Sequence, residues 1–101
     1  MRKIEEQLTK AIQAGESFRS GSTSYDPRTG TVVLYSTAIA QREGSGWKFN
    51  LGGFNTATTR SRLNAIATAE GLNPVGTCRG EPYVRAFDRK VPVPTDGWFF
   101  P

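Results

Sequence analysis

The sequence predicts an α+β fold, in which an antiparallel β-meander carries two helices on one face and is followed by a C-terminal hairpin. Two segments, at about residues 3–14 and 58–70, have apolar residues at helical spacing and end at a glycine. Between them, Trp47–Leu51 alternates strictly between apolar and polar residues, which is typical of a strand. Residues 75–88 have the pattern of a hairpin.

The first predicted helix, at about residues 3–14, has an ordinary amphipathic pattern. Its apolar stripe lies at positions i, i+4, i+7 and i+8, namely Ile4, Leu8, Ala11 and Ile12. Gly15 is placed to cap the C-terminal end. Glu5 and Glu6 lie in the first turn, where carboxylates interact favourably with the positive end of the helix dipole. We expect a surface helix here.

The next segment predicts an irregular strand, a hairpin loop and a second strand. Residues 18–25 are rich in Ser and Thr without a clear period, and we interpret them as one irregular strand. Residues 26–30, Asp-Pro-Arg-Thr-Gly, have the Pro and Gly of a hairpin loop. A strand begins at Thr31 and continues to about Ala40, across a bend if one is present.

The clearest strand is Trp47–Leu51, which follows a turn at residues 44–46. Its alternation places the two aromatic residues and Leu51 on one side and Lys48 and Asn50 on the other. We expect the aromatic side to face the core and Lys48 to point away from it.

The second predicted helix, at about residues 58–70, begins after Thr56 or Thr58, either of which can serve as its N-cap, and ends at Gly71. Its buried stripe consists of Leu63, Ile66 and Ala67. The same spacing places Arg60, Ser61 and Asn64 on the opposite, solvated side and Arg62 on a flank.

Residues 75–79 and 82–88 are expected to pair as a hairpin, after which the prolines beyond Lys90 exclude a regular central strand. We assign residues 1–94 to a single α+β domain and residues 95–101 to an aromatic C-terminal tail. A chain of 101 residues is too short for two separate cores.

The composition indicates a reducing compartment and favours an anionic partner. The single cysteine, Cys78, allows no intramolecular disulfide. The acidic residues that follow Met1 and the absence of a long apolar run predict neither a signal peptide nor a membrane span, so we expect a cytoplasmic protein. The net charge of +4 favours nucleic acid as a partner, although small basic proteins often bind none.

The residue types present argue against an enzyme. With no histidine and one cysteine, the chain lacks Ser–His and Cys–His nucleophilic pairs and zinc sites of the usual type. No Gly-rich phosphate-binding loop followed by lysine occurs. We therefore expect a non-catalytic protein without metal or cofactor.

Two motifs resemble a family of small bacteriophage-encoded proteins of unknown function. The first is the opening Met-Arg-Lys-Ile-Glu-Glu-Gln, and the second is Phe54-Asn-Thr-Ala-Thr-Thr-Arg-Ser-Arg-Leu-Asn-Ala65. The resemblance covers roughly residues 1–73. It implies a phage source and a role in the cytoplasm of the infected bacterium, and it assigns no chemistry.

Two departures from the family pattern stand out. Residues 34–37 read Leu-Tyr-Ser-Thr where members often carry Leu-His-Gly-Asn, and Phe54 stands where members often have Trp. A role that depends on that histidine is absent from this chain.

The second helix provides the first candidate site, a basic face for nucleic acid. Arginines in the first turns of a helix, together with hydroxyl and amide side chains, suit phosphate oxygens. The candidate residues are Arg60, Arg62, Lys48, Thr58, Thr59, Ser61 and Asn64. The structural alternative is that the threonines cap the helix and the arginines are solvated or pair with acids such as Glu70.

Two further candidates are aromatic. Tyr83, Arg85 and Phe87 share one side of the predicted hairpin and could stack on unpaired bases, but the same spacing is typical of a core-facing strand, which we favour. The tail residues Trp98–Phe100 either fold back on the sheet, which we favour, or form an interface with a partner or a second copy.

These features lead to two function hypotheses. The first is a phage accessory protein that binds nucleic acid through the basic helix face without catalysis. The alternative is an effector that inhibits a host or antiphage-defence protein through the aromatic tail or a sheet edge. A homodimer held by the tail is a third, purely structural option.

Overall fold

The computed structural model describes residues 2–101, which form two helices and nine strands. Their bounds, in chain order, are α1 (Lys3–Ala14), β1 (Phe18–Ser20), β2 (Thr23–Asp26), β3 (Thr31–Leu34), β4 (Thr37–Glu43), β5 (Gly46–Asn50), α2 (Ala57–Glu70), β6 (Val75–Cys78), β7 (Glu81–Ala86), β8 (Arg89–Pro92) and β9 (Trp98–Phe99). The predicted α+β class and both predicted helices are confirmed.

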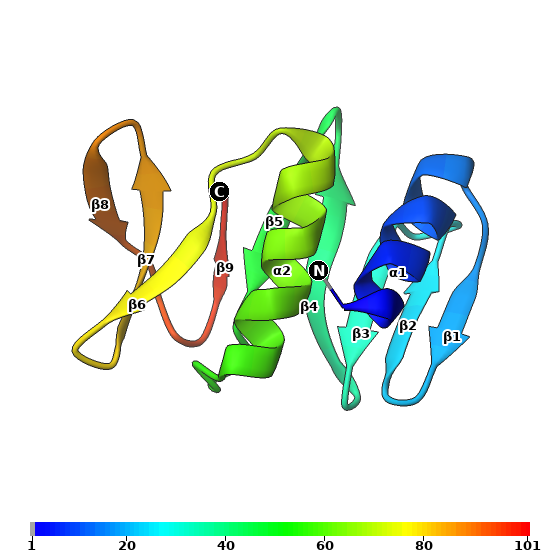
Figure 1. Cartoon of the computed structure of the whole chain (residues 1–101), viewed down its shortest axis with the longest axis horizontal. Helices are drawn as coiled ribbons and strands as arrows, with labels where there is room; N and C mark the ends of the chain where they lie inside the picture. Colours follow the sequence, from blue (N-terminus) through cyan, green and yellow to red (C-terminus); the bar gives the residue numbers. More distant parts are fainter. Residues whose placement is uncertain (1) are drawn as a thin grey trace.

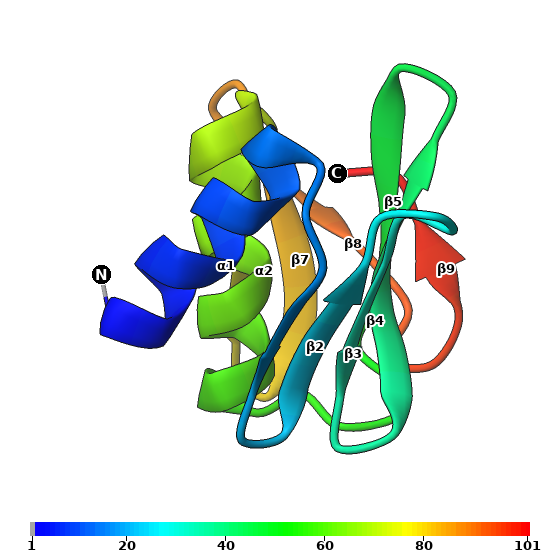
Figure 2. The same ribbon diagram turned by 90° about the vertical axis from the view of Figure 1, so that its right-hand side faces the viewer.

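The strands form two antiparallel sheets (Figure 1). The larger has the order β1-β2-β3-β4-β5-β9, and the smaller has the order β6-β7-β8. Figure 2 shows α1 and α2 on one side of the larger sheet, as predicted, and the smaller sheet lies next to α2. The other face of the larger sheet, which we call the outer face, is turned away from both helices.

The core lies between the helices and the inner face of the larger sheet. The predicted helix stripes are buried, including Leu8 of α1 and Leu63 of α2. From the sheet, Trp47, Phe49 and Leu51 are buried, which confirms the expected direction of that strand. Strand alternation therefore sets which face of β5 meets the helices.

Two segments that were expected to be continuous are hairpins instead. Residues 18–25 contain a tight turn at Gly21, whose backbone is left-handed with φ 58°, so they form β1 and β2. The strand expected to reach Ala40 reverses at Tyr35 and Ser36, with φ of 49° and 68°. Neither residue is a glycine, which is why the sequence did not signal this turn.

A β-bulge shapes the start of β4. The register between β3 and β4 shifts between Val32 and Val33. As a result, two consecutive residues of β4, Ile39 and Ala40, are both buried. A bulge adds one residue to one strand and thereby breaks the strict alternation of sides. This explains why β4 has no clear alternating pattern in the sequence.

β8 was not predicted. It pairs only with β7, at the edge of the smaller sheet, and its proline, Pro92, is the last residue of the strand. Proline is tolerated at such an edge because its missing N–H interrupts no ladder. The expectation that prolines exclude a central strand is consistent with this position.

The aromatic tail folds back on the sheet, which was the favoured alternative. β9 pairs with β5, with Phe99 opposite Phe49 and Trp98 opposite Asn50. The two phenylalanine rings meet edge to face at 6.2 Å between centroids, and Phe99 is only 7% exposed. Phe99 is therefore a core residue, and its assignment to a partner interface was wrong, whereas Trp98 is 39% exposed and Phe100 is 71% exposed.

Among residues 2–101 there is no helix of the length and apolar character that a membrane crossing requires.

We predict that truncating Phe99 destabilises the fold and that truncating Phe100 does not. Phe99→Ala removes a buried ring that packs on Phe49, which costs about 3–5 kcal/mol. Phe100→Ala changes an exposed position, so its effect on the free energy of unfolding stays within about 0.5 kcal/mol. Urea denaturation of both variants measures the difference, and equal midpoints would contradict the placement of β9.

Candidate functional site

The predicted basic face of α2 is occupied by contacts within the protein. Arg62 is buried at 7% exposure, and its Nη1 lies 2.6 Å from Oε2 of Glu5 in α1. Its Nε donates to the Thr23 hydroxyl of β2 at 3.2 Å. Arg62 lies on a flank of α2, as expected, but α1 packs across this flank and brings a carboxylate to the guanidinium, so its expected availability to nucleic acid was wrong.

The neighbours of Arg62 make similar structural contacts. The Ser61 hydroxyl donates to Glu5 Oε2 at 2.6 Å, so this oxygen accepts from two residues of α2. Thr59 is buried, and its backbone N–H donates to the hydroxyl of Thr56, which is the N-cap. The expectation that Ser61 lies on the solvated side of α2 was therefore wrong.

Asn64 and Arg60 fasten the smaller sheet to α2. The Asn64 amide donates to the carbonyl of Val75 at 2.8 Å and accepts from its N–H at 2.7 Å, at the start of β6. Arg60 donates to the backbone and side-chain oxygens of Asn55. The Asn55 amide in turn donates to Thr77 and to the carbonyl of Gly80 in the β6–β7 turn. Arg60 and Asn64 thus hold neighbouring segments in place.

Lys48 and Thr58 do not extend a common surface with the arginines. Lys48 points to the outer face of the larger sheet, while α2 covers the inner face. There its Nζ pairs with Glu43 at 3.2 Å and lies 4.9 Å from the Trp98 ring centroid. Thr58 is half-buried and lines a cavity near the β3–β4 turn. The structure does not bring the predicted nucleic-acid residues together as one exposed face.

The stripe of Tyr83, Arg85 and Phe87 lies on the solvent side of the smaller sheet. Pro82 and Val84 of β7 are buried instead, so the favoured core-facing interpretation of the stripe was wrong. The alternation of β7 was clear from the sequence, but it does not reveal which side meets the core. Either side carries enough apolar surface to face a core.

The exposed stripe continues onto β8. Lys90 lies opposite Arg85 in the antiparallel register, so both side chains belong to the same face. The Lys90 Nζ is 5.2 Å from the centroid of the Tyr83 ring. That ring lies over Gly76 of β6, where an added Cβ would be 2.6 Å from it, so the glycine leaves the space that the ring needs.

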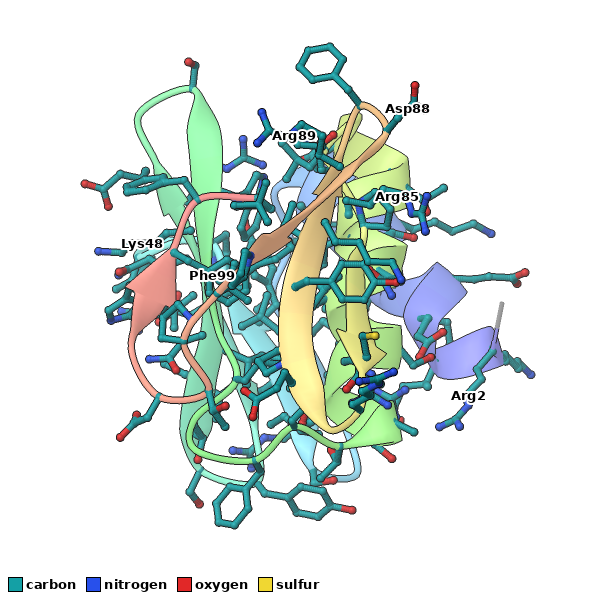
Figure 3. The ribbon with its side chains drawn as sticks, turned by 90° about the vertical axis from the view of Figure 1, so that its left-hand side faces the viewer. Arg2, Lys48, Arg85, Asp88, Arg89 and Phe99 are labelled. Atoms are coloured by element: carbon teal, nitrogen blue, oxygen red, sulfur yellow. The ribbon has the colours of Figure 1, made fainter. Side chains whose placement is uncertain are left out.

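Phe87 occupies the tip of the β7–β8 hairpin. It is 95% exposed, and its φ of 59° is left-handed, which is a rare conformation for a bulky side chain. Figure 3 shows Asp88 at this tip and Arg85 and Arg89 on opposite sides of the hairpin. No salt bridge among residues 2–101 includes Arg85, Arg89 or Lys90. We call Tyr83, Arg85, Phe87, Arg89 and Lys90 the hairpin surface.

The pKa of Glu5 reflects its buried position. Burial raises the pKa of this carboxyl, but hydrogen bonds from Ser61, Arg62 and the backbone N–H of Arg2 together lower it below its ordinary value of 4.5. Glu5 is therefore ionised at neutral pH and forms a true ion pair with Arg62.

Over the described chain, residues 2–101, no group of three or more His, Cys, Asp or Glu side chains could hold a metal ion.

The chain matches a model of a known protein family. The family model described as "Kyanoviridae Gp96 protein", a family of phage proteins, matches residues 1–99. The match includes residues 74–99, for which the sequence resemblance offered no counterpart. No curated protein and no solved structure matches the chain.

We predict that Arg62→Ala is strongly destabilising and that removing both charges is much less so. The single change leaves the Glu5 carboxylate buried without its partner, which costs about 3–5 kcal/mol. In the double variant Glu5→Leu/Arg62→Met no charge remains unpaired, so most of the loss is regained. Urea midpoints of the two variants provide the measurement, and a double variant as unstable as the single one would contradict the account.

We also predict that the Glu5 ion pair stabilises the fold in a pH-dependent way. Because the folded pKa lies below 4.5, the contribution is complete above pH 4.5 and is lost as pH falls through the folded value. The pKa of exposed Asp26 is also lowered, by hydrogen bonds from Arg28, so total acid sensitivity has more than one source. The urea midpoint of the wild type should therefore fall relative to that of Glu5→Leu/Arg62→Met as the pH is lowered from 7 to 3.

Proposed function

The chain belongs to the Kyanoviridae Gp96 family of phage proteins, and we propose that it binds single-stranded nucleic acid through the hairpin surface, without a catalytic step of its own. The place of action that we propose is the cytoplasm of the infected bacterium. The proposed binding surface lies on β7 and β8. It does not lie on α2, because the arginine and amide side chains of α2 form hydrogen bonds within the fold.

The exposure and the backbone conformation of Phe87 are the observations that support this proposal most directly. A phenylalanine that is 95% exposed contributes almost no burial to folding, and its left-handed backbone is strained. A glycine or asparagine would fit the turn better. A ring held in water at a hairpin tip is suited to stacking on an unpaired base, since every base presents a flat face.

The charges around Phe87 match a phosphate backbone. Arg85 and Lys90 lie on one side of the hairpin and Arg89 points to the other, so both sides of the hairpin that ends at Phe87 carry a cation. They outnumber the single acid of the turn, Asp88. Because these three cations form no salt bridge within the described chain, their charges are available to phosphates.

We predict salt-dependent binding to an oligonucleotide of mixed sequence. Phe87→Ala should weaken binding by roughly 5- to 150-fold, which corresponds to the loss of one stacking contact of about 1–3 kcal/mol. Arg85→Ala should flatten the log–log slope of affinity against salt by about 0.7, the contribution of one phosphate contact to a single strand. Fluorescence anisotropy at several salt concentrations measures both quantities.

Phe54→Ala is the matched control, because Phe54 is also an exposed phenylalanine, at 67%, but lies outside the hairpin surface. It should bind like the wild type. Equal affinities of Phe87→Ala and wild type, or binding that salt does not weaken, would overturn the proposal.

A second candidate function, inhibition of a host or antiphage-defence protein, is favoured by the outer face of the larger sheet. Trp98 lies on this face opposite Asn50 and beside Lys48, and the exposed ring of Phe100 follows it. The same face carries an open depression of about 810 Å³ near β1 and β2. If this candidate holds, the Trp98→Ala/Phe100→Ala variant will fail to capture a host protein that Phe87→Ala still captures at defined stoichiometry.

A further inference from the structure

A cavity lies at the opposite end of the molecule from the tip of the β7–β8 hairpin. It is formed by residues of the β3–β4 hairpin, the end of β5 and the segment that leads into α2, at the lower end of Figures 1 and 2. Its volume is about 400 Å³, and three buried aliphatic side chains line it, namely Leu34, Ile39 and Leu51. Cavities that hold small ligands have volumes of about 300–1,000 Å³.

The polar part of the lining is uncharged. Four threonines contribute to it, namely Thr37, Thr56, Thr58 and Thr59. The hydroxyls of Thr56 and Thr59 are 3.0 Å apart and hydrogen-bond to each other. Within the described chain, no lining residue carries a charge. A charged group would lose its hydration here without gaining an ionic partner, so the lining favours an uncharged occupant.

Two exposed aromatic residues also line the cavity. Tyr35 is 71% exposed and Phe54 is 67% exposed. Tyr35 and Ser36 are both left-handed, where residues with a Cβ are strained and glycine or asparagine is favoured. The chain therefore keeps a tyrosine in an unfavourable backbone conformation while its ring remains largely in water.

A close approach beneath the turn shapes the cavity. Gly52 has a φ of 69°, and a Cβ on it would be 2.5 Å from Cγ2 of Thr37, which lines the cavity. Only a glycine combines this backbone conformation with this contact. The loop after β5 can therefore lie against β4 and place Phe54 beside the cavity.

We propose that this cavity is a binding site for a small, free, uncharged aromatic molecule. A planar ring of that kind fits the volume, covers the aliphatic side chains and can stack on or meet edge to face the rings of Tyr35 and Phe54. The threonine hydroxyls can accept from or donate to one polar group on the ring. A base within a nucleic acid is disfavoured, because its phosphates would find no cation in the lining.

Titration of ¹⁵N-labelled protein with indole, followed by ¹H–¹⁵N NMR, tests the proposal. Saturable shifts should be confined to residues that line the cavity, with a dissociation constant on the order of 1 mM for a ligand of this size. Indole-3-acetate, which adds a carboxylate, should bind at least about tenfold more weakly. Indole-3-acetate that binds as tightly as indole would overturn the proposal, as would shifts that do not saturate.

Variants separate this site from the hairpin surface. Phe54→Ala should weaken indole binding by roughly two- to tenfold, because it removes one aromatic contact. Thr58→Leu, at a half-buried position of the lining, should fill the cavity and abolish binding. Phe87→Ala and Phe100→Ala should bind indole like the wild type, and an equal loss in Phe100→Ala would contradict a specific site. Phe54→Ala should weaken the binding of indole alone, and Phe87→Ala should weaken the binding of nucleic acid alone. Either proposal can therefore fail without the other.

Discussion

The ion pair between Glu5 and Arg62 is the interaction on which the arrangement of the other elements depends. It joins α1 to α2, and Arg62 also donates to Thr23, so a single guanidinium connects both helices with the sheet beneath them. A buried pair of this kind contributes little net stability compared with apolar residues of the same size, but the loss of one partner is costly. We infer that its main effect is to fix which side of each helix faces the other.

This arrangement gives a physical meaning to the two motifs that stand out in the sequence, the N-terminal segment and residues 54–65. Glu5 belongs to the N-terminal motif, and Ser61 and Arg62 belong to the second motif, and the two motifs meet at one carboxylate oxygen. Asn64 of the second motif also holds the start of β6. Ser61, Arg62 and Asn64, which resembled part of a binding face, therefore belong to the hydrogen-bonding centre of the fold and are not available as a nucleic-acid surface.

Periodicity was sufficient to predict both helices and β5, because each depends on a local spacing of apolar residues such as Leu63 and Ile66 or Trp47 and Phe49. Periodicity was insufficient where packing against another element of the fold determines whether a residue is buried. Arg62 has the helical position of a flank residue, and only the packing of α1 turns that flank into an interior. In β7, both sides of the strand carry apolar residues, so the sequence could not show whether the side of Tyr83 or the side of Val84 is buried. The turn at Tyr35 lacks the glycine that usually marks such a reversal.

The pairing of β9 with β5 has a consequence for folding kinetics. Every other neighbouring pair in the larger sheet joins strands that are consecutive in sequence, whereas β9 reaches β5 only after α2 and the whole smaller sheet have intervened. Contacts so distant along the chain form late, because closing a long loop costs entropy before any contact rewards it. Until then, β5 presents an unpaired, aromatic-rich edge that other chains can extend. A partly folded chain in which β9 has not yet paired would therefore expose this edge of the larger sheet.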